Sequence, residues 1–402
     1  MRSTRTLSKY LVQGLAFLTI FSFFFAACGT TANGNGTSST SKITVQVLDG
    51  GGELQLVKAI LQNYQKAHPD KVVFKFLPST TAPAVPGKIK AQEDAHKQDI
   101  SLVLGGYDMV ASGIQQGIWE QLLPSFSSKL PDFNSIYQAP VKQYAALTQG
   151  YAIPVVYTPS GPVFEYDPSK IANPPQTIDQ LKAWILANPG RFEYARPRNS
   201  GPGRTMLMGL PYLLGDKDPT DPAAGWTKTW QFLKDINPAI NYYPTRTGVT
   251  MTELGNDTRW MIASTMGWDI NPRYLGQVPA NFKTFVLKST TFVADDQFMF
   301  MPKGLDAAHQ SLITDIISWA LKPDQQAYTY DSGYFYPGPV VQNVPVSMAP
   351  ASSQHVIQQY GRPEYDSMAQ TNPIVMPLSA GNLNKAFDTW DSSIGGSKLK
   401  SS

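Results

Sequence analysis

The sequence predicts an α/β protein with two lobes. From residue 43 onward, short apolar segments typical of strands alternate with segments whose apolar residues recur at helical spacing. Removing a 27-residue leader from the 402 residues leaves about 375, which exceeds the roughly 250–300 residues at which a single hydrophobic core stops growing. The alternation also restarts beyond Tyr151, which favours a second lobe.

The first lobe is predicted to begin with a strand at 43–48. After a glycine-rich turn, a helix follows that carries on one face Leu54, Val57, Ile60, Leu61 and Tyr64. A second strand is predicted at 72–77. A third, at 100–104, is apolar enough for a buried parallel position, and the segment after it leads into a helix expected to run to Leu122.

The second lobe is predicted to contain a helix that starts with a capping box, Thr177 to Gln180, after two prolines. Two later helices are indicated by Leu312, Ile313, Ile316, Ile317 and Ala320, and by Leu383, Ala386, Phe387 and Trp390. We therefore expect five divisions after the leader: a tether at 28–41, the first part of lobe 1 at 42–152, lobe 2 at 153–290, a return to lobe 1 at 291–345, and a C-terminal helical segment at 346–402.

The N-terminus predicts export and lipid anchoring. Arg2, Arg5 and Lys9 precede an apolar run, and the small residues Ala26 and Ala27 follow it, as in a secretory signal peptide spanning 1–27. Cys28, which is the only cysteine, directly follows these alanines and resembles the lipidated cysteine of bacterial lipoproteins, although Phe25 stands where Leu is usual. Residues 28–41 contain no large apolar side chain and predict a flexible tether to the outer face of the cytoplasmic membrane.

The charge of the mature chain argues against nucleic acid as a partner. The formal net charge of +3 falls to about zero once the three positive charges of the leader are removed, and nucleic-acid recognition depends on clustered Lys and Arg. No later apolar run reaches the roughly 20 residues that a membrane-spanning helix needs. We expect a monomeric body outside the membrane.

These landmarks together resemble the extracellular solute-binding proteins of ABC importers, family 1, which have the type II periplasmic-binding-protein fold. The resemblance covers nearly all of residues 42–345. It is carried by the strand, turn and helix at 43–64 ending in His68-Pro69-Asp70, by 99–104, by 113–123, by Tyr151-Ala-Ile-Pro154, by 174–177, by Asn188-Pro-Gly-Arg-Phe192 and by Phe298-Met-Phe-Met-Pro302. The family implies two lobes joined by a hinge, a small-molecule ligand in the cleft, and delivery to a membrane permease.

Two loops of the first lobe are candidates for ligand contact. In open α/β sheets, ligands bind beyond the carboxyl ends of strands, where helix N-termini offer amide donors and glycines allow a close approach. The candidates are Gly51, Glu53, Gly106, Tyr107 and Asp108. Glycines that only form tight turns are the alternative.

The second lobe contributes a polar loop at 196–204, whose candidates are Arg198, Asn199, Ser200 and Arg204. They suit an anionic or carbonyl group, since guanidinium groups form charge-assisted hydrogen bonds. Arg204 is expected at the start of a helix, 205–214, as a surface arginine that contributes little to folding. Solvated arginines on a surface loop are the alternative.

Aromatic residues complete the candidate site. Trp268 and Asp269 could stack on a ligand and accept its donors, although Trp268 could equally belong to the core. Tyr157 lies on a stretch expected to cross between the lobes, and Tyr336 belongs to an aromatic patch with Tyr330, Tyr334 and Phe335.

No motif of catalysis is found. The four histidines are far apart in the sequence and form no spaced pair of metal ligands, and no nucleophile elbow or phosphate-binding loop is present. We therefore expect no cofactor and no enzymatic activity; a cell-surface hydrolase and a structural lipoprotein are the alternatives. The types of candidate residue do not distinguish among a sugar, a polyamine, a thiamine-like cation and an anionic compound as the ligand.

Overall fold

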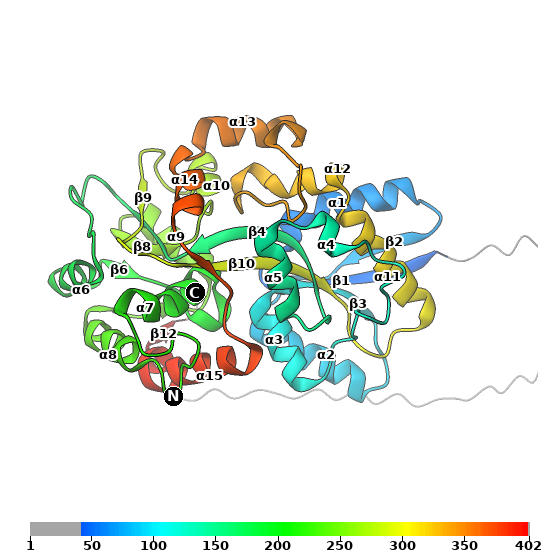
Figure 1. Ribbon diagram of the computed structural model, residues 1–402, viewed down its shortest axis with the longest axis horizontal. Helices are drawn as coiled ribbons and strands as arrows, with labels where there is room; N and C mark the ends of the chain where they lie inside the picture. The colour runs from blue at the N-terminus through cyan, green and yellow to red at the C-terminus, as the bar shows by residue number, and fades with distance from the viewer. Residues whose placement is uncertain (1–41, 401–402) are drawn as a thin grey trace, which may run out of the picture. The chain divides into compact units, whose positions relative to one another are not determined.

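The computed structural model describes residues 42–400 (Figure 1). The predicted signal peptide, Cys28 and the tether lie outside the described residues. None of the described helices is both long and apolar enough to cross a bilayer.

The larger sheet has six strands in the order β11-β10-β3-β1-β2, with β4 paired to β10. Strands β1, β2 and β3 are parallel to one another, whereas β10 runs antiparallel to both β3 and β4. Its strands are β1 (Ile43–Asp49), β2 (Val72–Phe76), β3 (Ile100–Gly106), β4 (Ile153–Gly161), β10 (Phe292–Phe300) and β11 (Ile374–Val375). The three strands predicted in the first lobe are thus confirmed.

The smaller sheet has four strands in the order β6-β8-β5-β9. They are β5 (Val163–Tyr166), β6 (Phe192–Glu193), β8 (Met261–Ser264) and β9 (Lys283–Phe285). A separate parallel pair joins β7 (Tyr243–Pro244) to β12 (Leu399–Lys400). The protein therefore has the mixed α/β architecture that the sequence predicts, with two principal sheets.

The chain passes between the two sheets at two places that lie close together. Strand β4 of the larger sheet is followed after Pro162 by β5 of the smaller sheet, and β9 of the smaller sheet is followed by β10 of the larger one. Strands β4 and β10 pair with each other, with Asp296 opposite Tyr157. The first crossing therefore leaves, and the second enters, the same antiparallel pair of strands (Figure 1).

Fifteen α-helices are described between residues 42 and 400. They are α1 (Leu54–Ala67), α2 (Val85–Asp94), α3 (Tyr107–Gln116), α4 (Phe133–Ile136), α5 (Ala139–Leu147), α6 (Ile178–Ala187), α7 (Gly201–Leu214), α8 (Thr227–Ile236), α9 (Thr247–Gly255), α10 (Ile270–Tyr274), α11 (Ala307–Ala320), α12 (Pro323–Gln326), α13 (Ala351–Tyr360), α14 (Pro363–Thr371) and α15 (Ala380–Trp390).

Local sequence explains where several helices begin and end. Thr177 caps α6 as predicted, since its hydroxyl accepts a hydrogen bond from the Gln180 amide. The expectation that the helix after β3 runs to Leu122 is wrong. That helix, α3, ends at Gln116 because Gly117 adopts a left-handed conformation with φ of 68°, which terminates a helix.

Two helices connect parts of the protein that are distant in sequence. Helix α7 contacts both β4 and β10 of the larger sheet and β8 of the smaller one. Helix α15 contacts α3, and its fully buried Trp390 donates a hydrogen bond to the Tyr194 hydroxyl at 3.0 Å. The N-terminus of α7 is consequently held beside the end of β3 and the middle of β10, where the candidate site lies.

Candidate ligand-binding site

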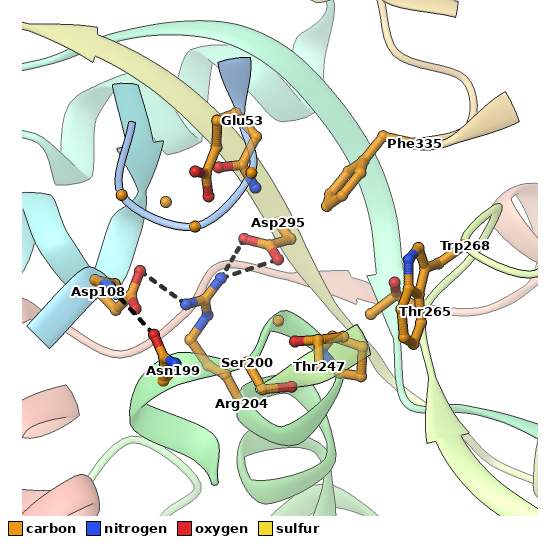
Figure 2. A pocket seen from close by; sticks show the side chains of 18 of the residues that line it. Glu53, Asp108, Asn199, Ser200, Arg204, Thr247, Thr265, Trp268, Asp295 and Phe335 are labelled. Atoms are coloured by element: carbon orange, nitrogen blue, oxygen red, sulfur yellow. Dashed lines mark hydrogen bonds and ion pairs between the residues drawn. The ribbon is translucent and has the colours of Figure 1, made fainter. Parts of the chain in front are cut away.

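A pocket is lined by segments from both sheets. It lies among the turn after β1, the junction of β3 and α3, the N-terminus of α7, the middle of β10, and loops near Trp268 and Tyr334. Figure 2 shows that the charged side chains gather on one side of this pocket and the aromatic side chains on the other.

The glycine-rich turn after β1 is organised by Asp49. One carboxylate oxygen, Oδ1, accepts hydrogen bonds from the amides of Gly52 at 3.0 Å and Glu53 at 2.9 Å. Gly52 has a φ of 110°, a conformation that residues with a β-carbon rarely adopt. The turn therefore needs glycine there, and it presents Glu53 to the pocket at the start of α1.

The junction of β3 and α3 requires a close approach of the backbone to charged groups. A β-carbon on Gly106 would lie 2.9 Å from an oxygen of Asp108 and 3.4 Å from a guanidinium nitrogen of Arg204. Glycine at this position therefore leaves room for the ion pair between these two side chains.

Arg204 forms the centre of the charged side. Its Nη1 lies 2.9 Å from Oδ1 of Asp108, and its Nη2 lies 2.7 Å and 2.9 Å from the two carboxylate oxygens of Asp295 (Figure 2). All three side chains are buried. The expectation of a surface arginine is therefore wrong. Arg204 lies within α7, which begins at Gly201, and its side chain faces β3 and β10.

The protonation of this triad follows from its burial. Burial lowers the pKa of the Arg204 guanidinium, but Asp295 and Asp108 raise it by more, so the pKa lies above its ordinary value. Burial raises the pKa of Asp295, and the Arg204 charge offsets part of that increase. Two carboxylates thus share one guanidinium, and the triad carries one excess negative charge when all three groups are ionised.

Glu53 adds further acidity. Burial raises its pKa well above the ordinary value, and the neighbouring Asp49 raises that pKa further. The Oε2 atom of Glu53 is buried without a hydrogen-bond partner among the described residues, and so is Oε1 of Gln297, which also lines the pocket. Two buried acceptors are thus available to a ligand that brings hydrogen-bond donors.

The opposite side of the pocket is aromatic. Trp268 and Phe335 lie on it together with Thr265 (Figure 2), and Tyr334 also lines the pocket. Tyr334 packs against the apolar cluster that contains Trp268, and the rings of Tyr334 and Phe335 are 5.7 Å apart. Such faces suit stacking on a planar group or contact with a cation.

A larger cavity adjoins the pocket. The pocket has a volume of about 80 Å³ and the adjoining cavity about 700 Å³. The two share the walls formed by Gly51, Gly52, Asn199, Thr247, Trp268 and Tyr334. We call the first the inner pocket and the second the outer cavity.

The structure brings eight of the thirteen predicted ligand-contact residues to the inner pocket. They are Gly51, Glu53, Gly106, Asp108, Asn199, Ser200, Arg204 and Trp268. Besides the ion-paired Asp108 and Arg204, two of these side chains already have structural partners. Asn199 accepts a hydrogen bond from the Ala82 amide at 3.1 Å, and the Ser200 hydroxyl accepts one from the Gly203 amide at 3.1 Å as the N-cap of α7.

Two predicted residues lie in the core beside β4 and β10. Tyr107 is fully buried with its ring 5.7 Å from that of Tyr144, and burial raises its pKa to about 12. Tyr157 lies within β4, and its amide donates to the Gly338 carbonyl at 2.8 Å. Neither lines the inner pocket or the outer cavity.

The other three predicted residues are paired with residues of the C-terminal helical region. Arg198 binds Asp388 and Asp391 of the α15 region, and the Tyr336 hydroxyl donates to Asp366 of α14 at 2.9 Å. Asp269 is completely buried, with hydrogen bonds from Arg273, Arg362 and Tyr365. These side chains therefore lie outside both the inner pocket and the outer cavity.

The sequence interpretation did not include Asp295 and Gln297, which line the inner pocket from β10. A signal was present, because Asp295, Asp296 and Gln297 interrupt an otherwise apolar strand. All three are buried, and polar side chains are placed in a buried strand only where partners or a function compensate for the cost. Thr247 and Thr265 were also missed, and no comparable signal marks them.

No cluster of three or more metal-ligating side chains occurs within residues 42–400. The inner pocket is lined by ion-paired side chains, buried acceptors and aromatic faces.

The sequence matches the family of bacterial extracellular solute-binding proteins over residues 59–355. The chain belongs to this family. Its members are receptors of ABC importers and are not enzymes. A search of curated proteins finds no match to this sequence.

Solved structures of ABC-transporter substrate-binding proteins share the fold. A periplasmic thiamin binding protein is 12% identical, covers 89% of this chain and 98% of its own, and has a TM-score of 0.62. The TpPotD lipoprotein of Treponema pallidum is 10% identical, with coverages of 88% and 99% and a TM-score of 0.62. The spermidine/putrescine substrate-binding protein PotD of Streptococcus pneumoniae is 14% identical, with coverages of 87% and 99% and a TM-score of 0.56. The two-lobed periplasmic-binding-protein fold is thereby confirmed.

Proposed function

We propose that this extracellular solute-binding protein captures a small organic cation in the inner pocket and delivers it to an ABC permease. The observation that carries this proposal is the pairing of Arg204 with Asp108 and Asp295. Within residues 42–400, the only basic group lining the inner pocket is already bound to carboxylates, so the charge that remains for a ligand is negative.

An anionic ligand would have to take Arg204 from its partners. Asp108 and Asp295 would then be buried without a counter-charge, and breaking a buried ion pair costs about 3–5 kcal/mol. A ligand that brings its own positive charge meets no such cost. It places its donors against Glu53 and Gln297, whose acceptor atoms have no partner among the described residues.

The aromatic side of the pocket supports the same class of ligand. The face of an indole or phenol ring attracts a cation by about 0.5–2 kcal/mol, more when water is excluded. Trp268 is 6% exposed and is placed opposite the carboxylates. Amines such as polyamines, and flat cations such as thiamine, both fit this description, and structural neighbours are named for spermidine/putrescine and for thiamin. A neutral sugar would use the acceptors but not the charge.

The anchor and the hinge belong to the same proposal. We infer that Cys28 carries lipid, that 28–41 tether the body to the outer face of the membrane, and that the protein acts as a monomer. We also infer that the lobes divide where the chain passes between the sheets, so that the paired strands β4 and β10 lead into the hinge. Closure about such a hinge would bring Trp268 and α7 towards the glycine-rich turn after β1.

A thermal-shift panel tests the ligand class. Compounds would be matched in size and differ in charge: diamines and polyamines, thiamine, neutral sugars, and oxyanions. A ligand at 100 times its Kd stabilises the folded state by about 2.7 kcal/mol, which for roughly 360 residues is a Tm increase of about 3–4 °C. Stabilisation by amines or thiamine and not by anions is expected.

Glu53→Gln is the matched variant, since it removes the carboxyl group that can ionise beside a bound cation and preserves the size of the side chain. Cations should bind it more weakly, and neutral compounds should be affected little. A panel in which oxyanions alone stabilise the wild type would contradict the proposal.

A further inference from the structure

The outer cavity differs from the inner pocket in charge. Three carboxylates and one arginine line the inner pocket. In contrast, the outer cavity is lined by hydroxyl, amide, glycine and apolar residues, and Arg246 is the one charged residue that the described part of the chain contributes to it. A ligand that reaches from the inner pocket into the outer cavity therefore passes from an acidic environment to a basic one.

The volumes allow a ligand to extend from the inner pocket into the outer cavity. Pockets for small organic molecules usually measure about 300–1,000 Å³. The inner pocket, at about 80 Å³, accommodates one functional group, whereas the outer cavity, at about 700 Å³, is large enough for the remainder of a molecule. Trp268 and Tyr334 border both chambers, so a ligand held between them has access to each.

Arg246 is available to bind that remainder. It directly precedes α9 and is exposed, and its guanidinium makes no ion pair or hydrogen bond with another residue of the described part of the chain. This distinguishes Arg246 from Arg204 and from Arg198, whose guanidinium groups are held by carboxylates. A free guanidinium beside a polar cavity binds carboxylate or phosphate through charge-assisted hydrogen bonds.

We propose that the ligand is an amine that carries an oxyanion, a carboxylate or a phosphate, at its far end. The cationic group occupies the inner pocket beside Glu53, and the oxyanion lies in the outer cavity against Arg246. This inference rests on the proposed function, because it assigns the cationic group to the inner pocket. It goes further by excluding simple polyamines as the best ligands, since a second ammonium group would be placed beside Arg246.

Paired compounds test the inference. Calorimetric titration of the full-length protein would compare alkyl diamines, ω-amino carboxylates and ω-amino alkyl phosphates of increasing chain length. At the length that spans both chambers, the compounds with an oxyanion should bind about tenfold or more tightly than the diamine. The carboxylate and phosphate arms show which oxyanion is preferred.

Three variants locate the effect. Arg246→Gln should remove the advantage of the oxyanion and leave the affinity for diamines unchanged or improved, whereas Arg246→Lys should retain most of it. Lys217→Gln removes a positive charge from an exposed residue that lines neither chamber, and it should change nothing. Arg246 is exposed, so circular dichroism should show all three variants folded like the wild type.

The outcomes separate this inference from the proposed function. Diamines that bind as tightly as the amino carboxylates and amino phosphates would overturn the inference and leave the proposed function standing. An advantage of the oxyanion that survives in Arg246→Gln would also overturn it. If no amine of any series binds the wild type, the proposed function fails and the inference fails with it.

Discussion

Replacing Arg204 by Met is expected to destabilise the unliganded protein strongly. Met keeps much of the apolar stem of the side chain and removes the guanidinium. Asp108 and Asp295, which lie within 2.9 Å of that guanidinium, are then left buried without a counter-charge. The surface position that the sequence suggested for Arg204 would instead predict almost no effect.

The magnitude follows from the burial of the triad. Arg204 is 4% exposed, Asp108 is 8% exposed and Asp295 is not exposed. Removing one partner of a buried ion pair costs about 3–5 kcal/mol. With an unfolding entropy of about 2.1 cal/mol/K per residue over roughly 360 residues, this corresponds to a Tm decrease of about 4–7 °C.

The pH dependence identifies the cause. In the wild type, burial raises the pKa of Asp295 and Arg204 offsets part of the increase; without Arg204 that pKa rises further. The folded variant then binds more protons than the unfolded chain between the unfolded pKa of about 3.9 and the raised folded value, so its stability falls as pH increases through that range. The deficit relative to the wild type should be largest near pH 7 and should shrink towards pH 4.

Denaturant unfolding at several pH values, followed by circular dichroism, measures this deficit. Arg246→Met is the matched control, because it removes an exposed arginine near the same site and should change the free energy of unfolding by no more than about 0.5 kcal/mol. A deficit of less than about 1 kcal/mol at pH 7 for Arg204→Met, or one that does not vary with pH, would refute the reasoning.

Three further predictions concern the ligand, the hinge and the anchor. Burial and Asp49 raise the pKa of Glu53, and a cation prefers the ionised carboxylate. Affinity for the cation should therefore increase as pH rises through that pKa, and binding should release a proton. Titrations in buffers of different ionisation enthalpy should detect this proton, and Glu53→Gln should abolish the pH dependence. Small-angle scattering should show a smaller radius of gyration with a confirmed ligand than without it; equal values would count against closure about the hinge. Cys28→Ser should move the protein from the membrane fraction to the soluble fraction on immunoblots, since no described helix can span a bilayer. Full retention of the variant in the membrane fraction would rule out the lipid anchor.

The sequence was a good guide to elements whose cause is local. The strand at 43–49 and the helix after it follow from the spacing of apolar residues, and the start of α6 follows from Thr177 and Gln180. The end of α3 was missed because the apolar spacing continues past Gly117, whose left-handed conformation stops the helix. Local periodicity therefore indicates that a helix exists more reliably than where it ends.

The sequence was a weaker guide to the site, because the roles of charged residues depend on distant partners. Arg198 and Arg204 stand six positions apart in one loop, yet the first binds carboxylates of the α15 region and the second binds Asp108 and Asp295. Likewise, Asp269 follows Trp268 directly, but Arg273, Arg362 and Tyr365 surround its carboxylate. No spacing rule within a segment reveals such pairings.

The pairings also change which ligand the same residues favour. Considered alone, two arginines in a polar loop suggest an anionic ligand; once both are bound to carboxylates, neither is available for one. Three groups in the inner pocket are still available to a ligand. They are the unpartnered side-chain oxygen of Glu53, the unpartnered side-chain oxygen of Gln297, and the face of Trp268. Each of these groups attracts hydrogen-bond donors or positive charge, through different physical interactions. Since the ion pairs, the free acceptors and the aromatic face are independent features of the structure, their agreement favours a cationic group in the inner pocket more strongly than any one of them.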